Sequence, residues 1–238
     1  MKQITDNIYL IDLGIVNAFI IEDNGLTLID SGPKGSADKI CAAIKKAGKR
    51  PEDIKQLILT HLHSDHTGSA AEIKRRLDIP VLAHPADAPL IAQGIAGRSG
   101  MQAAPGIING LIYHLFIKRA PKTVEPVTID ALLNDNDVLP IAGGTLVIHT
   151  PGHSAGHIAL LVKNEGTLIA ADICANMPRP GLSIVYEDIN QGIQSILKAT
   201  SYDFDKAVFG HGKPLIAGAS NKMSTIFSAI AAKQKIKS

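Results

Sequence analysis

Four segments of the 238-residue chain share one pattern, in which a short apolar strand runs directly into a loop that starts with histidine or aspartate. These loops start at His61, His153, Asp172 and His211. Because the ends of neighbouring strands meet at one edge of a sheet, we expect these side chains to converge. Imidazoles and carboxylates bind divalent metals, so the pattern favours a fold that gathers four strand ends around a metal centre.

The first loop, residues 61–66, reads His-Leu-His-Ser-Asp-His and carries four candidate ligands. Residues two apart on an extended backbone point the same way, so His61 and His63 can bind one ion. Asp65 and His66 follow a bend and can face a second ion. This donor set suits Zn²⁺, and also Fe or Mn. We therefore expect two divalent metal ions per chain, with zinc as the first candidate.

The motifs HLHSDH, HTPGHSAGH, AADI and FGHG together resemble those of the metallo-β-lactamase superfamily, over about residues 8–212. The resemblance implies an α/β fold of the αββα type, in which two stacked mixed β-sheets are flanked by helices. The dinuclear site would lie at one edge. The implied ligands form two groups and a bridge: His61, His63 and His153 for one metal; Asp65, His66 and His211 for the other; and Asp172 between them.

Departures from individual branches of the superfamily narrow the resemblance. Secreted β-lactamases generally lack the bridging aspartate and carry a signal peptide, so Asp172 argues against antibiotic hydrolysis as the native role. The short tail after His211 lacks the helical domain that binds glutathione in glyoxalase II-type thioesterases. The chain therefore resembles a glyoxalase II-like or lactonase-like branch without that domain.

Each half of the chain begins with strands and continues into helices, which predicts stacked sheets covered by helices within a single domain of residues 1–238. The expected strands are 8–11, 16–21, 26–29, 57–59, 81–83, 138–141, 146–148, 157–162, 168–170 and 207–209. Helices are expected over 37–47, 68–77, 189–197 and 221–235.

Residues 85–126 are too apolar for a linker, and we expect a helical insertion or the wall of a pocket. Within them, residues 107–117 carry apolar side chains at helical spacing. This stripe predicts a helix that packs into the core. A lid, a substrate wall or a dimer contact is the alternative.

The other histidines are expected to be structural rather than metal-binding. His149 and His157 are expected to form hydrogen bonds nearby, and no role is assigned to His84 or His114, although His114 could reach the pocket.

Two further residues lie close to the candidate ligands in the sequence. Asp30 ends a strand, where it could hold the ring N–H of a ligating histidine or act as a turn residue. Cys174 follows Asp172 by two positions, and we expect it to pack in the core.

Charge and composition limit the possible partners. The net charge is only +2, from 24 basic and 22 acidic residues, which gives no general attraction to nucleic acid or anionic membranes. No segment approaches the ~18 apolar residues of a membrane helix. We expect a small-molecule substrate, with no nucleic acid and no membrane as partner, and the oligomeric state stays open.

The N-terminus and the cysteines bear on the compartment. Residues 1–7 lack the apolar run of a signal peptide, and the two cysteines form no disulfide or zinc-binding pattern. These features favour a cytoplasmic protein.

The leading hypothesis for function is a metal-dependent hydrolase of an ester, thioester or lactone. A hydroxide shared by two metals would attack the carbonyl, with Asp65 as the catalytic residue that orients it and accepts a proton. A phosphodiesterase or an iron-containing redox enzyme on the same ligands is the alternative. A non-enzymatic metal-binding module is a third possibility.

Overall fold

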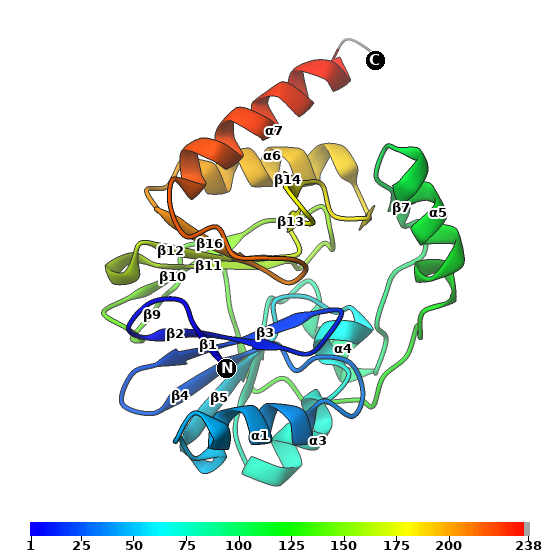
Figure 1. The fold of residues 1–238 in the computed structure, drawn as a ribbon. Helices are drawn as coiled ribbons and strands as arrows, with labels where there is room; N and C mark the ends of the chain where they lie inside the picture. Colours follow the sequence, from blue (N-terminus) through cyan, green and yellow to red (C-terminus); the bar gives the residue numbers. More distant parts are fainter. Residues whose placement is uncertain (236–238) are drawn as a thin grey trace.

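Two β-sheets lie face to face between two layers of helices in the computed structural model, which describes residues 1–235 (Figure 1). The predicted arrangement of two stacked mixed sheets flanked by helices is confirmed. None of the helices in this described part of the chain is long and apolar enough to cross a membrane.

The first sheet has seven strands. Neighbouring strands are antiparallel among the first four in spatial order and parallel from the fourth strand to the seventh. Their spatial order is β1 (Lys2–Gln3), β2 (Ile8–Asp12), β3 (Asn17–Glu22), β4 (Leu26–Ile29), β5 (Ile54–Ile58), β6 (Val81–Ala83) and β8 (Ala131–Leu132). Helices α1 (Ala37–Lys46) and α3 (Ala70–Leu77) cover its outer face (Figure 1). The turn from β3 to β4 has Asn24 and Gly25 at positive φ, which Gly adopts because it lacks a Cβ atom and which Asn tolerates.

The second sheet has five strands, and only its pair β12 and β16 is parallel. The order is β16 (Lys206–Phe209), β12 (Thr167–Ala171), β11 (Ile158–Val162), β10 (Thr145–His149) and β9 (Val138–Leu139). Helices α6 (Ile189–Thr200) and α7 (Ala219–Lys235) cover its outer face (Figure 1). The Asp188 side chain caps α6 by accepting a hydrogen bond from the Gln191 N–H.

Three apolar clusters hold the four layers together. The central cluster lies between the sheets and includes Phe19, Val147 and Ile169, all fully buried. The outer clusters place helices on each sheet, with Ile40 of α1 in one and Ile196 of α6 in the other. Because the inner strands are covered on both faces, they read in the sequence as continuous apolar runs.

Short elements complete the connections between the sheets and helices. They are η1 (Pro51–Asp53), α2 (Ser64–Thr67), α4 (Ala88–Ala92), β7 (Gln102–Ala103), α5 (Ile107–Leu115), η2 (Ile117–Arg119), η3 (Lys163–Glu165), β13 (Ala175–Asn176), β14 (Pro180–Gly181) and β15 (Val185–Tyr186).

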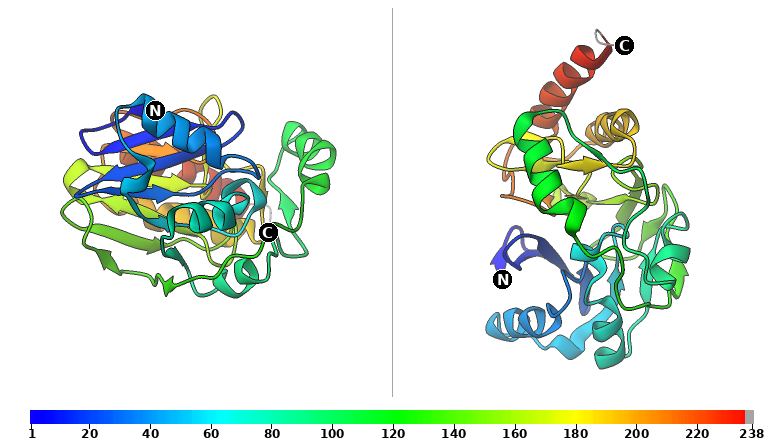
Figure 2. Two further views of the ribbon diagram at one scale, coloured as in Figure 1. Left: turned by 90° about the horizontal axis from the view of Figure 1, so that it is seen from below. Right: turned by 90° about the vertical axis from the view of Figure 1, so that its right-hand side faces the viewer.

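The prediction that residues 107–117 form a core-packing helix was wrong. Helix α5 forms, but it buries none of its residues, and Ile107 is 92% exposed. Figure 2 shows α5 standing beside the sheets rather than on them. The apolar spacing correctly predicted a helix. In the described part of the chain, however, no sheet or helix packs over this helix closely enough to bury its residues.

Helix α5 belongs to a projecting segment, residues 96–122, which we call the arm. The arm leaves and rejoins the body beside the bridge between Ile95 and Thr123. It is also held by the pairing of β7 with β15. The arm is thus a supported wall, and several of its large apolar side chains are exposed.

Candidate metal centre

The four predicted loops converge at one edge of the two sheets. The first loop follows β5 and continues into α2, and the other three follow β10, β12 and β16. The ligand atoms of His61, His63 and His153 lie within 4.8 Å of one another, and we call these residues the first triad. Those of a second triad lie within the same limit: Asp65, His66 and His211.

The Asp172 carboxylate lies between the two triads. Its Oδ2 is 3.6 Å from His153 Nε2 and 3.1 Å from His211 Nε2, and its Oδ1 is 3.5 Å from His66 Nε2. This is the place that the family resemblance implies for a bridging aspartate. The structure therefore brings all seven sequence-predicted residues together.

Several polar atoms at this centre are buried and have no hydrogen-bond partner within residues 1–235. They are the Nε2 atoms of His61, His63, His66 and His153, and Oδ1 of Asp172. Leaving one such atom unsatisfied costs about 1–3 kcal/mol. The ion pair between His66 Nε2 and Asp172 Oδ1, 3.5 Å apart, offsets this cost for two of the atoms, and the cluster as a whole favours a ligand that satisfies the rest. Convergent nitrogen and oxygen atoms are the donor set that divalent metals take, and the residues fit such an ion.

Hydrogen bonds at the Nδ1 atom orient three of the candidate histidine ligands. The Nδ1 atom of His66 donates to Asp30 Oδ2 at 2.8 Å, and that of His153 donates to the Val185 carbonyl at 2.8 Å. His211 Nδ1 donates to the Ile15 carbonyl at 2.6 Å. Each bond directs Nε2 toward the centre, which is how proteins prepare imidazole for metal binding.

Of the two roles left open for Asp30, the structure shows the supporting one. Besides His66, its carboxylate accepts hydrogen bonds from the Thr60 N–H and hydroxyl, both at 2.8 Å. The Thr60 hydroxyl oxygen in turn accepts from His61 Nδ1 at 3.0 Å. One buried aspartate thus supports a histidine in each triad.

The histidines of the first triad are neutral at pH 7. Burial lowers the pKa of His63 to about 4 and that of His153 to about 3, and it also holds the pKa of His61 well below its usual value. Neutral imidazoles keep the lone pair that a metal needs.

The second triad has the opposite electrostatics. Burial disfavours protonation of His66 and His211, but Asp172 and the other nearby carboxylates outweigh it. The pKa of His66 therefore lies well above its usual value, and that of His211 is raised to about 10. Although burial alone would raise them, the pKa values of Asp65 and Asp172 are held well below the usual range by these histidines.

Four other histidines lie outside the two triads in the described part of the chain. His157 Nδ1 donates to the Thr150 hydroxyl at 2.7 Å, and its Nε2 accepts from the Asp172 N–H at 3.1 Å. His149 stacks on His84 with ring centroids 3.9 Å apart, and His114 bonds the carbonyl of its own helix. These contacts agree with the structural roles expected for His149 and His157.

Sequence reasoning missed Asp87, which is fully buried behind the first triad. Its carboxylate accepts hydrogen bonds from the Leu62 N–H at 3.1 Å, the Ser154 hydroxyl at 2.7 Å and the Gly156 N–H at 2.9 Å. Leu62 lies between two candidate ligands, and Ser154 follows a third. Asp87 therefore joins the two loops that supply the first triad.

Arg98 neutralises Asp87 and links it to the arm. Its Nη1 lies 2.8 Å from Asp87 Oδ1 and 3.1 Å from Glu187 Oε1. Glu187 also accepts a hydrogen bond from the Ala155 N–H at 2.8 Å. The sequence signal for Asp87 was its place shortly after β6. An aspartate at such a place is equally typical of a turn, so the position did not indicate a role at the site.

Gly210 is a second residue whose role the sequence did not reveal. A Cβ atom there would lie 1.9 Å from Asp172 Oδ1 and 2.9 Å from His66 Cε1. The absence of a side chain lets the chain after β16 lie against the Asp172 carboxylate.

A cavity of about 930 Å³ opens from the centre toward the arm. Asp65, His153, Asp172 and His211 line one part of it, and apolar residues of the arm line another. This volume is at the upper end of the usual range for small-molecule sites.

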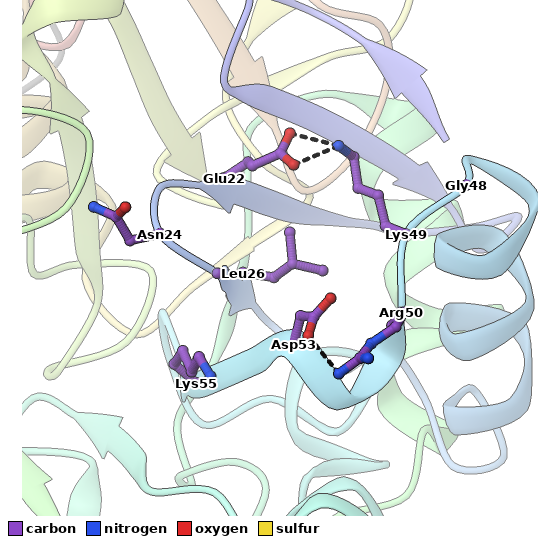
Figure 3. Close-up of a pocket in the computed structure, with 9 residues that line it drawn as sticks. Glu22, Asn24, Leu26, Gly48, Lys49, Arg50, Asp53 and Lys55 are labelled. Carbon is purple, nitrogen blue, oxygen red and sulfur yellow. Dashed lines mark hydrogen bonds and ion pairs between the residues drawn. The ribbon is translucent and has the colours of Figure 1, made fainter.

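A smaller hollow of about 500 Å³ lies beside the β3–β4 turn (Figure 3). Two ion pairs lie in it, Lys49 with Glu22 and Arg50 with Asp53. It contributes none of the candidate metal ligands.

Comparison with known proteins agrees with this geometry. Residues 11–211 match the family model described as the metallo-beta-lactamase superfamily. The chain is 26% identical over 220 residues to the probable metallo-hydrolase YflN of Bacillus subtilis (strain 168), covering 84% of this chain and 82% of that protein. It is 29% identical over 128 residues to an N-acyl homoserine lactonase of a Bacillus species, covering 54% of this chain and 40% of that protein.

Solved structures show the same fold. BJP-1, a subclass B3 metallo-β-lactamase of Bradyrhizobium japonicum, aligns with a TM-score of 0.72 at 23% identity. The alignment covers 99% of this chain and 93% of that one.

We predict that metal uptake by the second triad releases protons at pH 7. His66 and His211 hold a proton in the metal-free protein because their pKa values lie above 7, and a metal needs the same lone pair. Calorimetry of Zn²⁺ binding in buffers of different ionisation enthalpy measures this release. His211→Gln should release about one proton fewer, and His149→Gln should match the wild type. Equal release by wild type and His211→Gln would contradict the assignment.

We predict that Asp87→Asn weakens metal binding by the first triad. The change removes a buried charge paired with Arg98 and places an amide N–H against donors, so the free energy of unfolding should fall by about 3 kcal/mol. Urea unfolding and competition with a chelator measure the two effects. Asp38→Asn is the control, since Asp38 forms an exposed ion pair with Arg76 and should change neither.

Proposed function

The chain belongs to the metallo-β-lactamase superfamily, and from this we propose that it is a dinuclear metal-dependent hydrolase that cleaves an ester, thioester or lactone. The observation that carries the proposal is the cluster of buried, unpartnered donor atoms around Asp172, beside a cavity large enough for a small molecule. The similarity to an N-acyl homoserine lactonase supports hydrolysis of a carbonyl compound.

The two triads would hold one metal each, with Asp172 shared. When bound, two divalent ions would supply a nucleophilic hydroxide near neutral pH and polarise the substrate carbonyl. Zinc is our first candidate, with iron or manganese as alternatives, because the donors are imidazoles and carboxylates. Cys174 is fully buried in the core beneath α6 and offers no thiolate, since burial raises its pKa far above neutral.

Asp65 is the residue that we assign to proton transfer. Its carboxylate lines the cavity and lies 3.3 Å from His211 Nε2, and its side chain is 30% exposed. The depressed pKa keeps it ionised at pH 7, so it can orient the nucleophile through a hydrogen bond. A proton that it accepts can pass to the leaving group or to water in the cavity.

The charges around the cavity favour a carbonyl substrate over a phosphodiester. Arg98 lines the cavity, but its guanidinium is engaged by Asp87 and Glu187. Arg179 and Lys213 are not among the lining residues, and three lysines that are, Lys34, Lys118 and Lys122, are exposed. A phosphodiester calls for cationic clamps at the reacting group beyond the metals.

We predict that the purified protein contains close to two equivalents of Zn, Fe or Mn. Asp172→Ala should lose both ions because both triads share its carboxylate, whereas His61→Ala should mainly lose one. Elemental analysis measures both losses. His149→Gln is the control and should retain the wild-type content. A fully active preparation with one tightly bound metal would refute the dinuclear assignment.

We predict that carbonyl substrates are cleaved with kcat/KM about two orders of magnitude above that of phosphodiesters. A phosphodiester would lack a cationic transition-state donor in this cavity, and the loss of one such donor lowers the rate by about this factor. The panel is a p-nitrophenyl acyl ester, an aliphatic lactone, an acyl thioester and bis-p-nitrophenyl phosphate. A preference for the phosphate would reverse the order of the two hydrolase hypotheses.

A further inference from the structure

We propose that the cavity binds an extended, uncharged acyl group of the substrate, and that Ile112 and Phe116 on the arm determine the preferred length of that group. This inference rests on the proposed function and names its substrate class. It is carried by the shape and lining of the cavity and by the two faces of α5.

The cavity is continuous from the candidate metal ligands to the arm. His63 and Asp172 line it at the metal centre, and Ile112, Phe116 and Ile117 line it on the arm. A carbonyl group placed at the metal centre therefore leaves the rest of an acyl substituent facing the arm.

Large apolar side chains are exposed on both sides of this space. From the body, Ile15 is 73% exposed and Met177 is 50% exposed, and both line the cavity. From the arm, Phe116 is 67% exposed and Ile112 is half-buried. Apolar surface gathered around one cavity is stabilised when an apolar ligand removes it from water.

Ile15 connects this apolar wall directly to the metal centre. Its carbonyl accepts the hydrogen bond from His211 Nδ1, while its side chain lines the cavity. An acyl chain bound against Ile15 would thus begin next to a candidate ligand.

Charged groups do not oppose an uncharged chain in this cavity. Among its described lining residues, Arg98 is engaged by Asp87 and Glu187, and Glu125 pairs with Arg75. The lining lysines are exposed, where their ammonium groups remain in contact with water.

Helix α5 carries apolar residues on two faces, and only one of them meets the cavity. The face that lines it includes Ile112 and Tyr113, and Phe116 lines it directly after the helix ends. Ile108 and Leu111 are exposed and are not among the lining residues. The Tyr113 hydroxyl donates to the Met101 carbonyl at 3.1 Å, which fixes how α5 sits on the arm. Adjacent residues of one helix therefore give a matched pair, Ile112 for the cavity and Leu111 for the control.

The test measures kcat/KM for p-nitrophenyl esters with acyl chains from two to twelve carbons. We expect a rise of about fourfold per methylene group until the cavity is filled. Ile112→Ala should lower kcat/KM for the decanoate by a factor at least about ten times larger than for the acetate. Ile112→Trp should shift the optimum to shorter chains, and Leu111→Ala should follow the wild type throughout.

A binding measurement separates this inference from the proposed function. Decanamide should displace the neutral fluorophore N-phenyl-1-naphthylamine from the protein, butanamide should displace it at least about a hundredfold less tightly, and Ile112→Ala should reduce this difference. If no ester is cleaved but this pattern holds, the cavity assignment stands and the hydrolase assignment fails. If esters are cleaved without dependence on chain length, or if Ile112→Ala and Leu111→Ala behave alike, the cavity assignment is overturned. A preference for acyl chains ending in a carboxylate would also overturn it.

Discussion

The hydrogen bond at the outer ring nitrogen of the candidate histidine ligands is the interaction on which the centre depends. Each acceptor comes from a segment other than the loop that carries the histidine: Asp30 for His66, the Val185 carbonyl of β15 for His153 and the Ile15 carbonyl for His211. A ring fixed in this way cannot rotate to satisfy its inner nitrogen with solvent or a neighbour. The fold thus brings distant segments together, and hydrogen bonds between them fix the positions of the inner ring nitrogens.

The same contacts join the two sheets at the site. The Ile15 loop belongs to the first sheet, whereas His211 follows the last strand of the second. Asn17 strengthens this join, because its side-chain amide donates to the carbonyls of Phe209 and Gly212 at 2.9 and 3.0 Å. Asp87 makes a second join, between the loops of His63 and His153. The hydrogen bonds that position the candidate ligands therefore also hold the two sheets together at this edge.

The strands, and the convergence of the seven candidate ligand residues at one edge, could be predicted because both follow from a local pattern, an apolar run followed by His or Asp. The burial of α5 could not be predicted in this way, since helical spacing shows which residues share a face but not what covers it. Asp87 was missed because its partners Leu62 and Ser154 are 25 and 67 residues away in the chain. The role of Asp30 stayed open for the same reason, because only the folded chain brings it to His66.

The bond between Ile15 and His211 has a consequence for synthesis of the chain, because it joins residues 196 positions apart. A ribosome releases the HLHSDH loop long before it releases His211. While the intervening residues are being made, the histidines of this loop therefore lack the partners that come later in the chain. Only a chain that extends past His211 can close the second triad. Closure of the second triad is thus a late event of biogenesis, and a translation product that ends before His211 would carry the HLHSDH motif with only part of the candidate metal centre.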